Sequence, residues 1–215
     1  MSPIKGFFKK YSHLFLLLYA VIYIPWFNYL ERTVTTDFHT IYLPVDSKIP
    51  FCEYFILPYF SWFLYVGITI IFIALTDGKT CWKLGLYLII GMTIFLIIST
   101  IYPNGDYLRP DTFLRDNFCV DLVKKLYSMD TPTNIVPSLH VFNSLGIHIG
   151  ICHTKYLKNK KGIRVASFCL MCLIILSTMF LKQHSVIDVI AAFLMFAVLY
   201  PVCFYLLPKK IKSLS

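Results

Sequence analysis

The sequence predicts an all-α membrane protein, a polytopic helix bundle with six transmembrane helices. Hydrophobic residues make up 58% of the chain and charged residues only 14%, which is far from the balance of a soluble domain. Long apolar stretches recur, each close to the roughly 20 residues that a helix needs to cross the bilayer core. Together they leave little chain for anything else, so we expect one integral membrane domain over residues 1–215.

The predicted spans follow the apolar stretches along the chain. The first stretch is too long for a cleavable signal peptide and lacks a small-residue cleavage site, so we expect it to be retained. The fourth begins at Pro137, which the first turn of a helix accepts because the missing donor would have no partner there. The six stretches lie near residues 12–30, 54–76, 83–102, 137–156, 165–182 and 185–207.

Basic residues gather in alternate connections, which predicts the orientation. By the positive-inside rule these connections face the cytoplasm, so we expect both the N and C termini there and the acid-rich loops outside, at the plasma membrane. The net charge of +9 is then a topology signal. Binding of nucleic acid is not expected, because it needs a basic face on a soluble surface. The basic residues are Lys5, Lys9, Lys10, Lys79, Lys83, Lys155, Lys158, Lys160, Lys161, Arg164, Lys209, Lys210 and Lys212.

Two histidines, His140 and His184, lie at the outer ends of predicted spans. A residue that titrates near neutrality is expensive beside a bilayer and usually serves chemistry there. Asp188 lies one helical turn after His184, so its carboxylate can hold one imidazole nitrogen and leave the other free as a nucleophile. Ser138 and the amides that follow it begin a helix, which favours anion binding.

A purely structural interpretation of these residues stays open. Ser138 also suits a plain helix start, and Ser185 with Asp188 matches a capping box. The first outer loop, residues 31–53, is expected to be solvated, with a headgroup site as the alternative. The remaining histidines lack company comparable to that of His140 and His184, so we expect them to serve packing or the membrane interface. They are His13, His39, His148 and His153.

The motif Pro137-Ser138-Leu139-His140 resembles the second signature, usually Pro-Ser-Gly-His, of the type 2 phosphatidic acid phosphatase superfamily. The segment from Ser177 through His184 to Asp188 resembles the third signature, and Arg109-Pro110 resembles the end of the first. The resemblance covers the chain from about residue 54 to residue 207, which we expect to be the catalytic core.

The resemblance implies phosphoryl transfer from a lipid phosphate, on the extracytoplasmic side of the bilayer, with no metal and no cofactor. His184 would attack phosphorus and form a phosphohistidine, Asp188 would orient it, and His140 would protonate the leaving oxygen and then activate water or an alcohol. Such a reaction asks mainly for positioning and for positive charge around the phosphate oxygens. The expected phosphate-binding residues are Arg109, Ser138, Leu139, Lys182 and Arg115.

Departures from the family pattern concern the expected charges. Tyr102 stands where the first signature has a lysine, and Thr178 stands where the third has an arginine. Lys182 and Arg115 are the candidate replacements. Leu139 replaces the usual glycine, which resembles the branch of inositol phosphorylceramide synthases, with sphingomyelin synthases as a further comparison.

Three functions therefore remain open at this point. The first is a lipid phosphatase that hydrolyses a phosphomonoester or a pyrophosphate. The second is a phosphotransferase that moves a phospho-headgroup between lipids. The third is a membrane scaffold or transporter with vestigial motifs, and the oligomeric state is open in every case.

Overall fold

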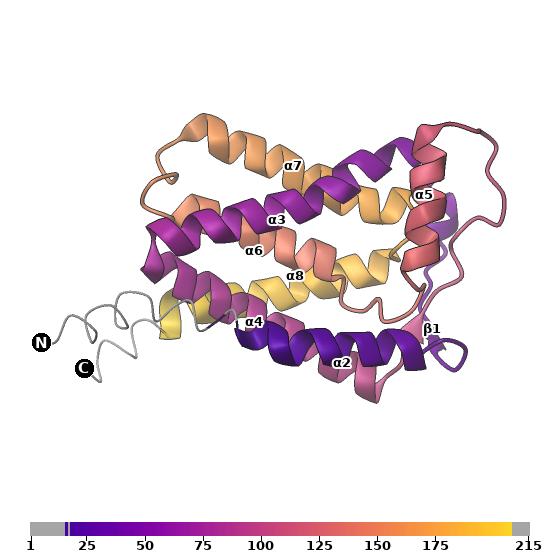
Figure 1. Ribbon diagram of the computed structural model, residues 1–215, viewed down its shortest axis with the longest axis horizontal. Helices are drawn as coiled ribbons and strands as arrows, with labels where there is room; N and C mark the ends of the chain where they lie inside the picture. Colours follow the sequence, from indigo (N-terminus) through magenta and orange to yellow (C-terminus); the bar gives the residue numbers. More distant parts are fainter. Residues whose placement is uncertain (1–15, 17, 208–215) are drawn as a thin grey trace, which may run out of the picture.

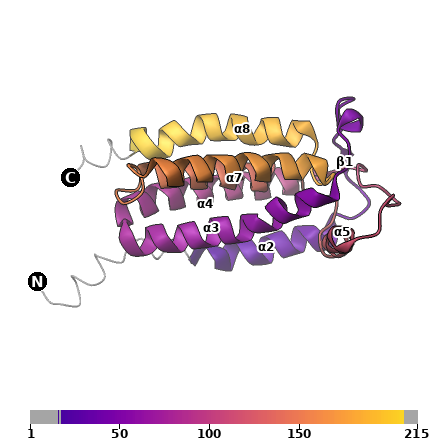
Figure 2. The same cartoon turned by 90° about the horizontal axis from the view of Figure 1, so that it is seen from above.

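The computed structural model describes residue 16 and residues 18–207, and this part of the chain is mostly helical, as predicted. Six of its α-helices run roughly along the long axis of the molecule, while α5 lies across one end (Figures 1 and 2). The α-helices are α2 (Ala20–Thr33), α3 (Ile56–Thr76), α4 (Gly78–Ile101), α5 (Phe118–Met129), α6 (Leu139–His153), α7 (Lys161–Phe180) and α8 (Val186–Pro201), and a π-helical turn, η4 (Val202–Leu206), extends the last one.

Within the described residues, four helical segments are long and apolar enough to cross a membrane: Glu53–Thr76, Gly78–Ile101, Lys161–Phe180 and Val186–Leu206. The described parts of α2 and α6 have only 14 and 15 residues. A helix of 15 residues spans roughly 22 Å, less than the hydrocarbon core. Six spans and the orientation of the termini therefore stay predictions, and residues 12–15 and 17 of the first expected span lie outside the described part.

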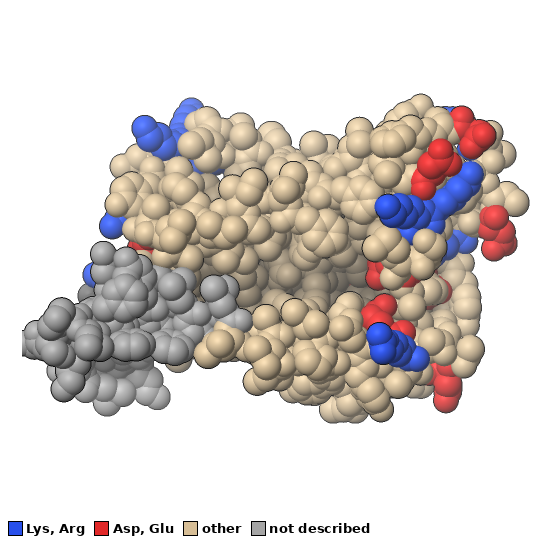
Figure 3. All heavy atoms as spheres, viewed as in Figure 1, with Lys and Arg blue, Asp and Glu red and all other residues tan. Residues whose placement is uncertain are grey.

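The outer surface of these helices is apolar. Large hydrophobic side chains of α3 and α8 are more than half exposed, such as Phe63, Leu64, Ile68 and Leu194. Figure 3 shows charged residues at the two ends of the molecule, separated by a wide band without charge. Exposed apolar surface of this extent marks contact with a partner or a membrane, and the uncharged band favours the membrane.

Helix α6 lies in the centre of the bundle and is fixed by close contact with α4. The rings of Tyr87 and Phe142 stack with centroids 4.3 Å apart, and the Tyr87 hydroxyl donates to the Phe142 carbonyl at 3.0 Å. Each ring lies against a glycine of the other helix, because a Cβ on Gly91 would be 2.1 Å from the Phe142 ring and one on Gly146 would be 2.3 Å from the Tyr87 ring. This contact sets the position of α6.

Three loops are joined at the end that carries α5. Strand β1 (His39–Thr40) pairs in parallel with β2 (Asn104–Gly105), and Gly105 also bridges to Thr133. Two short 3-10 turns follow β1, namely η2 (Asp46–Lys48) and η3 (Glu53–Phe55). The solvation expected of the loop over residues 31–53 is wrong for Asp46 and Glu53, which are only 2% and 3% exposed. Both side chains hold other parts of the chain.

Helix α5 was not expected within the long segment before the fourth span. Its side chains Val120, Val123 and Leu126 recur every three residues and are buried. Val123 and Leu126 contribute to a small core with Ile56 and Tyr59 at the start of α3. The Asn117 side chain caps the helix by accepting from the Val120 amide at 3.1 Å. This helix covers the end of the bundle where the histidines lie.

Candidate active site

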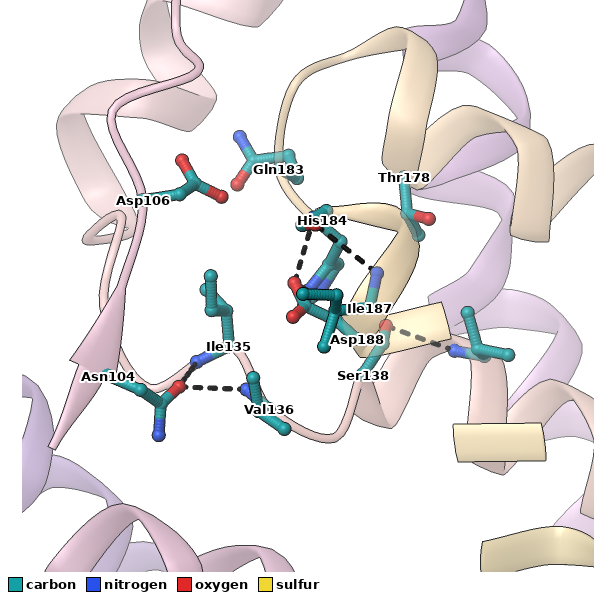
Figure 4. A network of polar contacts seen from close by, with 12 residues as sticks. Asn104, Asp106, Ile135, Val136, Ser138, Thr178, Gln183, His184, Ile187 and Asp188 are labelled. Atoms are coloured by element: carbon teal, nitrogen blue, oxygen red, sulfur yellow. Dashed lines mark hydrogen bonds and ion pairs between the residues drawn. The ribbon is translucent and has the colours of Figure 1, made fainter. Parts of the chain in front are cut away.

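His184 lies in the turn between α7 and α8, with its imidazole held by the first turn of α8. Its Nδ1 is 3.2 Å from Oδ2 of Asp188, and the same oxygen accepts from the Ser185 amide at 2.9 Å (Figure 4). Ser185 and Asp188 form the predicted capping box. Asp188 therefore both caps α8 and orients His184. A neutral imidazole that donates from Nδ1 presents an unprotonated Nε2.

The charge of His184 follows from its surroundings. Burial, and then the positive charge of Arg109, lower the pKa of His184 from 6.5 to about 3, although a hydrogen bond with the backbone of Ile135 acts in the opposite direction. Because the pKa lies well below 7, the imidazole is neutral at physiological pH. A neutral imidazole is the form that can act as a nucleophile.

His140 is the second residue of α6 and lies next to His184, with ring centroids 5.8 Å apart. Its ring also packs against Tyr59 and Trp62 of α3, at 4.6 Å from each. Its Nε2 is buried and has no hydrogen-bond partner among the described residues. In the described part of the chain, no protein group therefore competes for a proton on this nitrogen.

The segment that leads into α6 is held by Asn104 of β2. The Asn104 Oδ1 accepts from the amides of Ile135 and Val136, each at 2.9 Å (Figure 4). After these residues, the Ser138 amide donates to the Asp188 carbonyl at 3.2 Å. The start of α6 is thus tied to the start of α8, and His140 is positioned relative to His184.

Both histidines line a cavity of about 590 Å³ between α2, α3, α5 and α6. In Figure 3 the surface is hollowed between α2 and α3. The walls combine an aromatic part with a polar part close to the loop after α5. The aromatic lining residues are Tyr23, Phe27, Tyr59, Phe60, Trp62, Phe63 and Phe95. The polar ones, besides the two histidines, are Glu31, Lys125, Asp130, Thr131, Thr133, Asn134 and Gln183.

Arg109 lies beside this cavity and not on its lining. Its Nη1 donates to the Asp130 carbonyl at 2.7 Å, and its Nη2 donates to the Thr131 carbonyl at 3.1 Å and to Oε1 of Gln183 at 2.9 Å. The guanidinium also stacks on the ring of Tyr127 at 4.7 Å. Direct contact between Arg109 and a phosphate stays a prediction. In the structure, Arg109 reaches the cavity through its hydrogen bond with Gln183, which is a lining residue.

The expected replacement cations, Lys182 and Arg115, are both directed elsewhere. The Lys182 ammonium donates to the carbonyls of Asp46 and Ile49, at 2.6 and 2.5 Å, because these backbone oxygens would otherwise be buried without a donor. The Arg115 guanidinium lies 3.0 Å from Oε1 of Glu53 and its side chain is 62% exposed. The structure brings neither cation to the lining of the cavity.

Of the remaining positions considered for the phosphate site, the side chains of Ser138 and Thr178 are fully buried, and Leu139 reaches the cavity. Ser138 begins α6 as its N-cap, one residue after the predicted start at Pro137, and its Oγ accepts from the Val141 amide at 3.5 Å. Leu139 lines the cavity. Thr178 is fully buried, and its carbonyl accepts from the amides of Gln183 and His184. It therefore holds the His184 turn through its backbone.

The ring of Tyr102, at the other departure from the family pattern, stacks on His39 with centroids 4.1 Å apart.

Two of the other histidines take the packing roles expected of them. His148 Nδ1 pairs with the Ser167 hydroxyl at 2.9 Å, and His153 Nδ1 pairs with the Ile149 carbonyl at 2.9 Å. His13 lies outside the described residues.

Three residues that hold or line the site were missed by the sequence interpretation. Asp46 accepts from the Ser185 hydroxyl at 2.6 Å and from the Val186 amide at 2.9 Å, and Asn104 fixes the approach to α6. Gln183 lines the cavity next to His184, and its Nε2 is buried without a partner in the described part. Only Gln183 had a signal in the sequence, namely its place directly before His184.

Comparisons with protein-family models, with curated proteins and with solved structures find no match to this chain. The geometry by itself describes one imidazole held by the side chain of Asp188, a second imidazole close to it, and a partly aromatic cavity that both of them line.

Proposed function

We propose that this chain is a membrane lipid phosphatase that hydrolyses a lipid phosphomonoester or pyrophosphate through a phosphohistidine on His184. The observation that carries the proposal is the pairing of His184 with Asp188, 3.2 Å apart, at a cavity that His140 also lines. A nucleophile, a group that orients it and a group that transfers protons are thereby gathered around one space large enough for part of a lipid.

The proposed reaction has two steps. In the first, Nε2 of His184 attacks phosphorus, a P–N bond forms, the P–O bond to the lipid breaks, and the leaving oxygen takes a proton from His140. The negative charge of the bound phosphate favours the protonated imidazole that this step needs. In the second, His140 takes a proton from water, the water oxygen attacks phosphorus, the P–N bond breaks, and inorganic phosphate leaves.

Gln183 and the start of α6 are the proposed contacts of the phosphate oxygens. The Gln183 amide is oriented by Arg109, which has donors only, so Oε1 faces the guanidinium and Nε2 remains to donate. Arg109 would then act on the phosphate through Gln183 and through its charge. The amides of Leu139 and His140, at the N-terminus of α6, are the other donors that we propose.

For the protein in its membrane, we propose six spans, with both termini in the cytoplasm and the histidine site on the outer side of the plasma membrane. The basic α6–α7 connection lies at the opposite end of the molecule from α5 (Figure 1), which supports this orientation under the positive-inside rule. The aromatic wall of the cavity suits an acyl chain that enters from the bilayer.

A phosphotransferase is the second candidate, and the charges around the cavity favour it. Lys125 is the single Lys or Arg among the described lining residues, whereas Glu31 and Asp130 are both acids. A phosphodiester carries less negative charge than a phosphomonoester and therefore needs fewer cations. In a transferase the same phosphohistidine would be attacked by the hydroxyl of an acceptor lipid instead of water.

Turnover by the purified full chain in a non-ionic detergent separates these functions. Phosphate-labelled phosphatidate and phosphatidylethanolamine are supplied with and without ceramide, and free phosphate and new ceramide-linked phospholipid are followed together. Free phosphate supports the phosphatase, and acceptor-dependent phospholipid supports the transferase. His184→Ala is expected to abolish either product, while His39→Ala, an exposed histidine outside the cavity lining, is the matched control. Equal rates in wild type and His184→Ala would contradict both enzymes.

A further inference from the structure

The polar end of the cavity is rich in hydrogen-bond acceptors. Glu31, near the end of α2, and Asp130, directly after α5, both line it. The negative charge of Glu31 acts on Asp130, whose pKa is raised to about 6 by burial first and by Glu31 second, against the effect of Arg109. Asp130 has an ion pair with Arg109 at 3.9 Å, which is near the limit for such a contact. Glu31 accepts from the Thr131 hydroxyl at 2.6 Å and from Nδ2 of Asn134 at 3.0 Å, both neutral donors. Two carboxylates therefore line one space, and Arg109 at 3.9 Å from Asp130 is the cation that the described ion pairs bring to them.

Asn134 supplies an independent observation at the same place. It is 5% exposed, lines the cavity, and its Oδ1 has no hydrogen-bond partner in the described part of the chain. The amide orientation is fixed because Nδ2 donates to Oε1 of Glu31 at 3.0 Å, and a carboxylate accepts only. The free atom is therefore an acceptor. A buried acceptor without a donor is costly unless a ligand supplies that donor.

Aromatic rings complete this end of the cavity. Phe27 lies one helical turn before Glu31 on α2, so both side chains share a face of the helix. The ring of Phe27 stacks with Tyr23 at 5.6 Å, and both rings line the cavity. Aromatic faces beside carboxylates are the combination that holds an ammonium group.

We propose that this acceptor-rich end binds an ammonium group of the substrate, so that the preferred lipid is zwitterionic, with its amine a few bonds from the phosphate. Glu31, Asp130 and Asn134 would receive the ammonium while His184 faces the phosphorus. This inference rests on the proposed function, and it explains why a phosphate site is lined by acids. The amine can belong to the carbon chain of a lipid phosphomonoester, which the phosphatase would use, or to an ethanolamine-type headgroup, a phosphodiester that the transferase would use.

Equilibrium binding tests the site without relying on turnover. The full-length His184→Ala protein in maltoside detergent is titrated with three radiolabelled lipids of equal chain length: hexadecylphosphoethanolamine, 2-aminohexadecyl phosphate and hexadecyl phosphate. The first two carry an ammonium on the headgroup and on the chain, and the third carries none. We expect at least one amine lipid to bind about tenfold more tightly than hexadecyl phosphate. Binding of hexadecyl phosphate that equals or exceeds both would overturn the proposal.

Variants that remove the charge of Glu31 or Asp130 test whether the preference for amine lipids over hexadecyl phosphate arises at this end of the cavity. Glu31→Gln and Asp130→Asn are each expected to reduce the preference for the amine lipid to less than about threefold, while Asp111→Asn, an exposed acid of the α4–α5 connection, keeps it. Asp130→Asn removes no short hydrogen bond of the side chain, so it serves even where Glu31→Gln fails to fold. An unchanged preference in Asp130→Asn would contradict the site. If the wild type turns over no lipid but the amine preference holds in these titrations, only the proposed function fails.

Discussion

Asp46 and Ser185 are 139 positions apart in the sequence, and the Ser185 hydroxyl donates to Oδ2 of Asp46 at 2.6 Å. The other carboxylate oxygen accepts from the Val186 amide at 2.9 Å, and the Asp46 carbonyl accepts from Lys182. The first outer loop thus holds the His184 turn on both sides of the histidine. A loop that was expected to be solvated is part of the frame of the site.

Asp46→Asn tests this frame. The amide replaces one acceptor by a donor, so the backbone amide of Leu43 or of Val186, which can only donate, loses its acceptor. The free energy of unfolding is expected to fall by about 1.5–3 kcal/mol. We expect kcat to fall severalfold with little change in KM, because the substitution moves His184 and not the cavity wall. Steady-state kinetics and thermal unfolding in detergent measure both effects. Asp37→Asn, an exposed acid of the same loop, is the control, and an equal loss there would argue against a specific frame.

Asp188→Asn separates the role of Asp188 in orienting the His184 imidazole from the binding of the lipid. The variant keeps a side chain of the same size in the first turn of α8 but loses the charge that holds Nδ1 of His184. We expect kcat to fall by roughly 10²- to 10⁴-fold with lipid binding retained. Pre-steady-state kinetics with a labelled lipid measure the step directly. A variant with wild-type kcat would show that the carboxylate serves the helix cap alone.

The low pKa of His184 predicts a dependence of stability on pH. With a pKa of about 3 when folded and about 6.5 when unfolded, the unfolded state binds more protons between these values. The contribution of His184 to stability is therefore complete above pH 6.5 and is lost progressively as the pH falls toward 3. Thermal unfolding of wild type and His184→Asn between pH 4.5 and 8 isolates it, because all other groups are shared. Parallel curves would mean that His184 titrates normally.

The contact between α4 and α6 predicts a steric effect on the site. A methyl group in Gly91→Ala would lie 2.1 Å from the Phe142 ring, so α6 has to shift and His140 with it. We expect a loss of about 1–3 kcal/mol in stability and reduced turnover. Gly67→Ala on α3 is the matched control, since nothing lies within 4 Å of the added carbon. Thermal unfolding and activity of both variants, measured side by side, check the effect, and equal stability would exclude it.

The features that the sequence predicts well are local. The pairing of His184 with Asp188 and the capping box of Ser185 follow from spacing within one helical turn, and both are present. The helical character of the long apolar segments is confirmed as well, because composition and length decide it. Helix α5 was missed because its 12 residues are too few for a membrane span and some of them are charged.

The features that could not be predicted depend on contacts between distant segments. Lys182 carries a long flexible stem, and its direction is decided by two backbone carbonyls of the first outer loop. The role of Asn104 depends on the pairing of β1 with β2, two-residue strands without a sequence pattern of their own. The acid-lined end of the cavity joins α2 to the segment after α5, which no spacing along the chain reveals.

The most direct measurement is rapid quenching of the wild-type protein during turnover of a phosphate-labelled lipid, followed by mass spectrometry under alkaline conditions that preserve phosphohistidine. We expect a phosphoryl group on His184 that disappears when the lipid is exhausted and is absent from His184→Ala. Turnover that depends on His140 and Asp188, with the label on another residue or on none, would contradict a covalent role of His184.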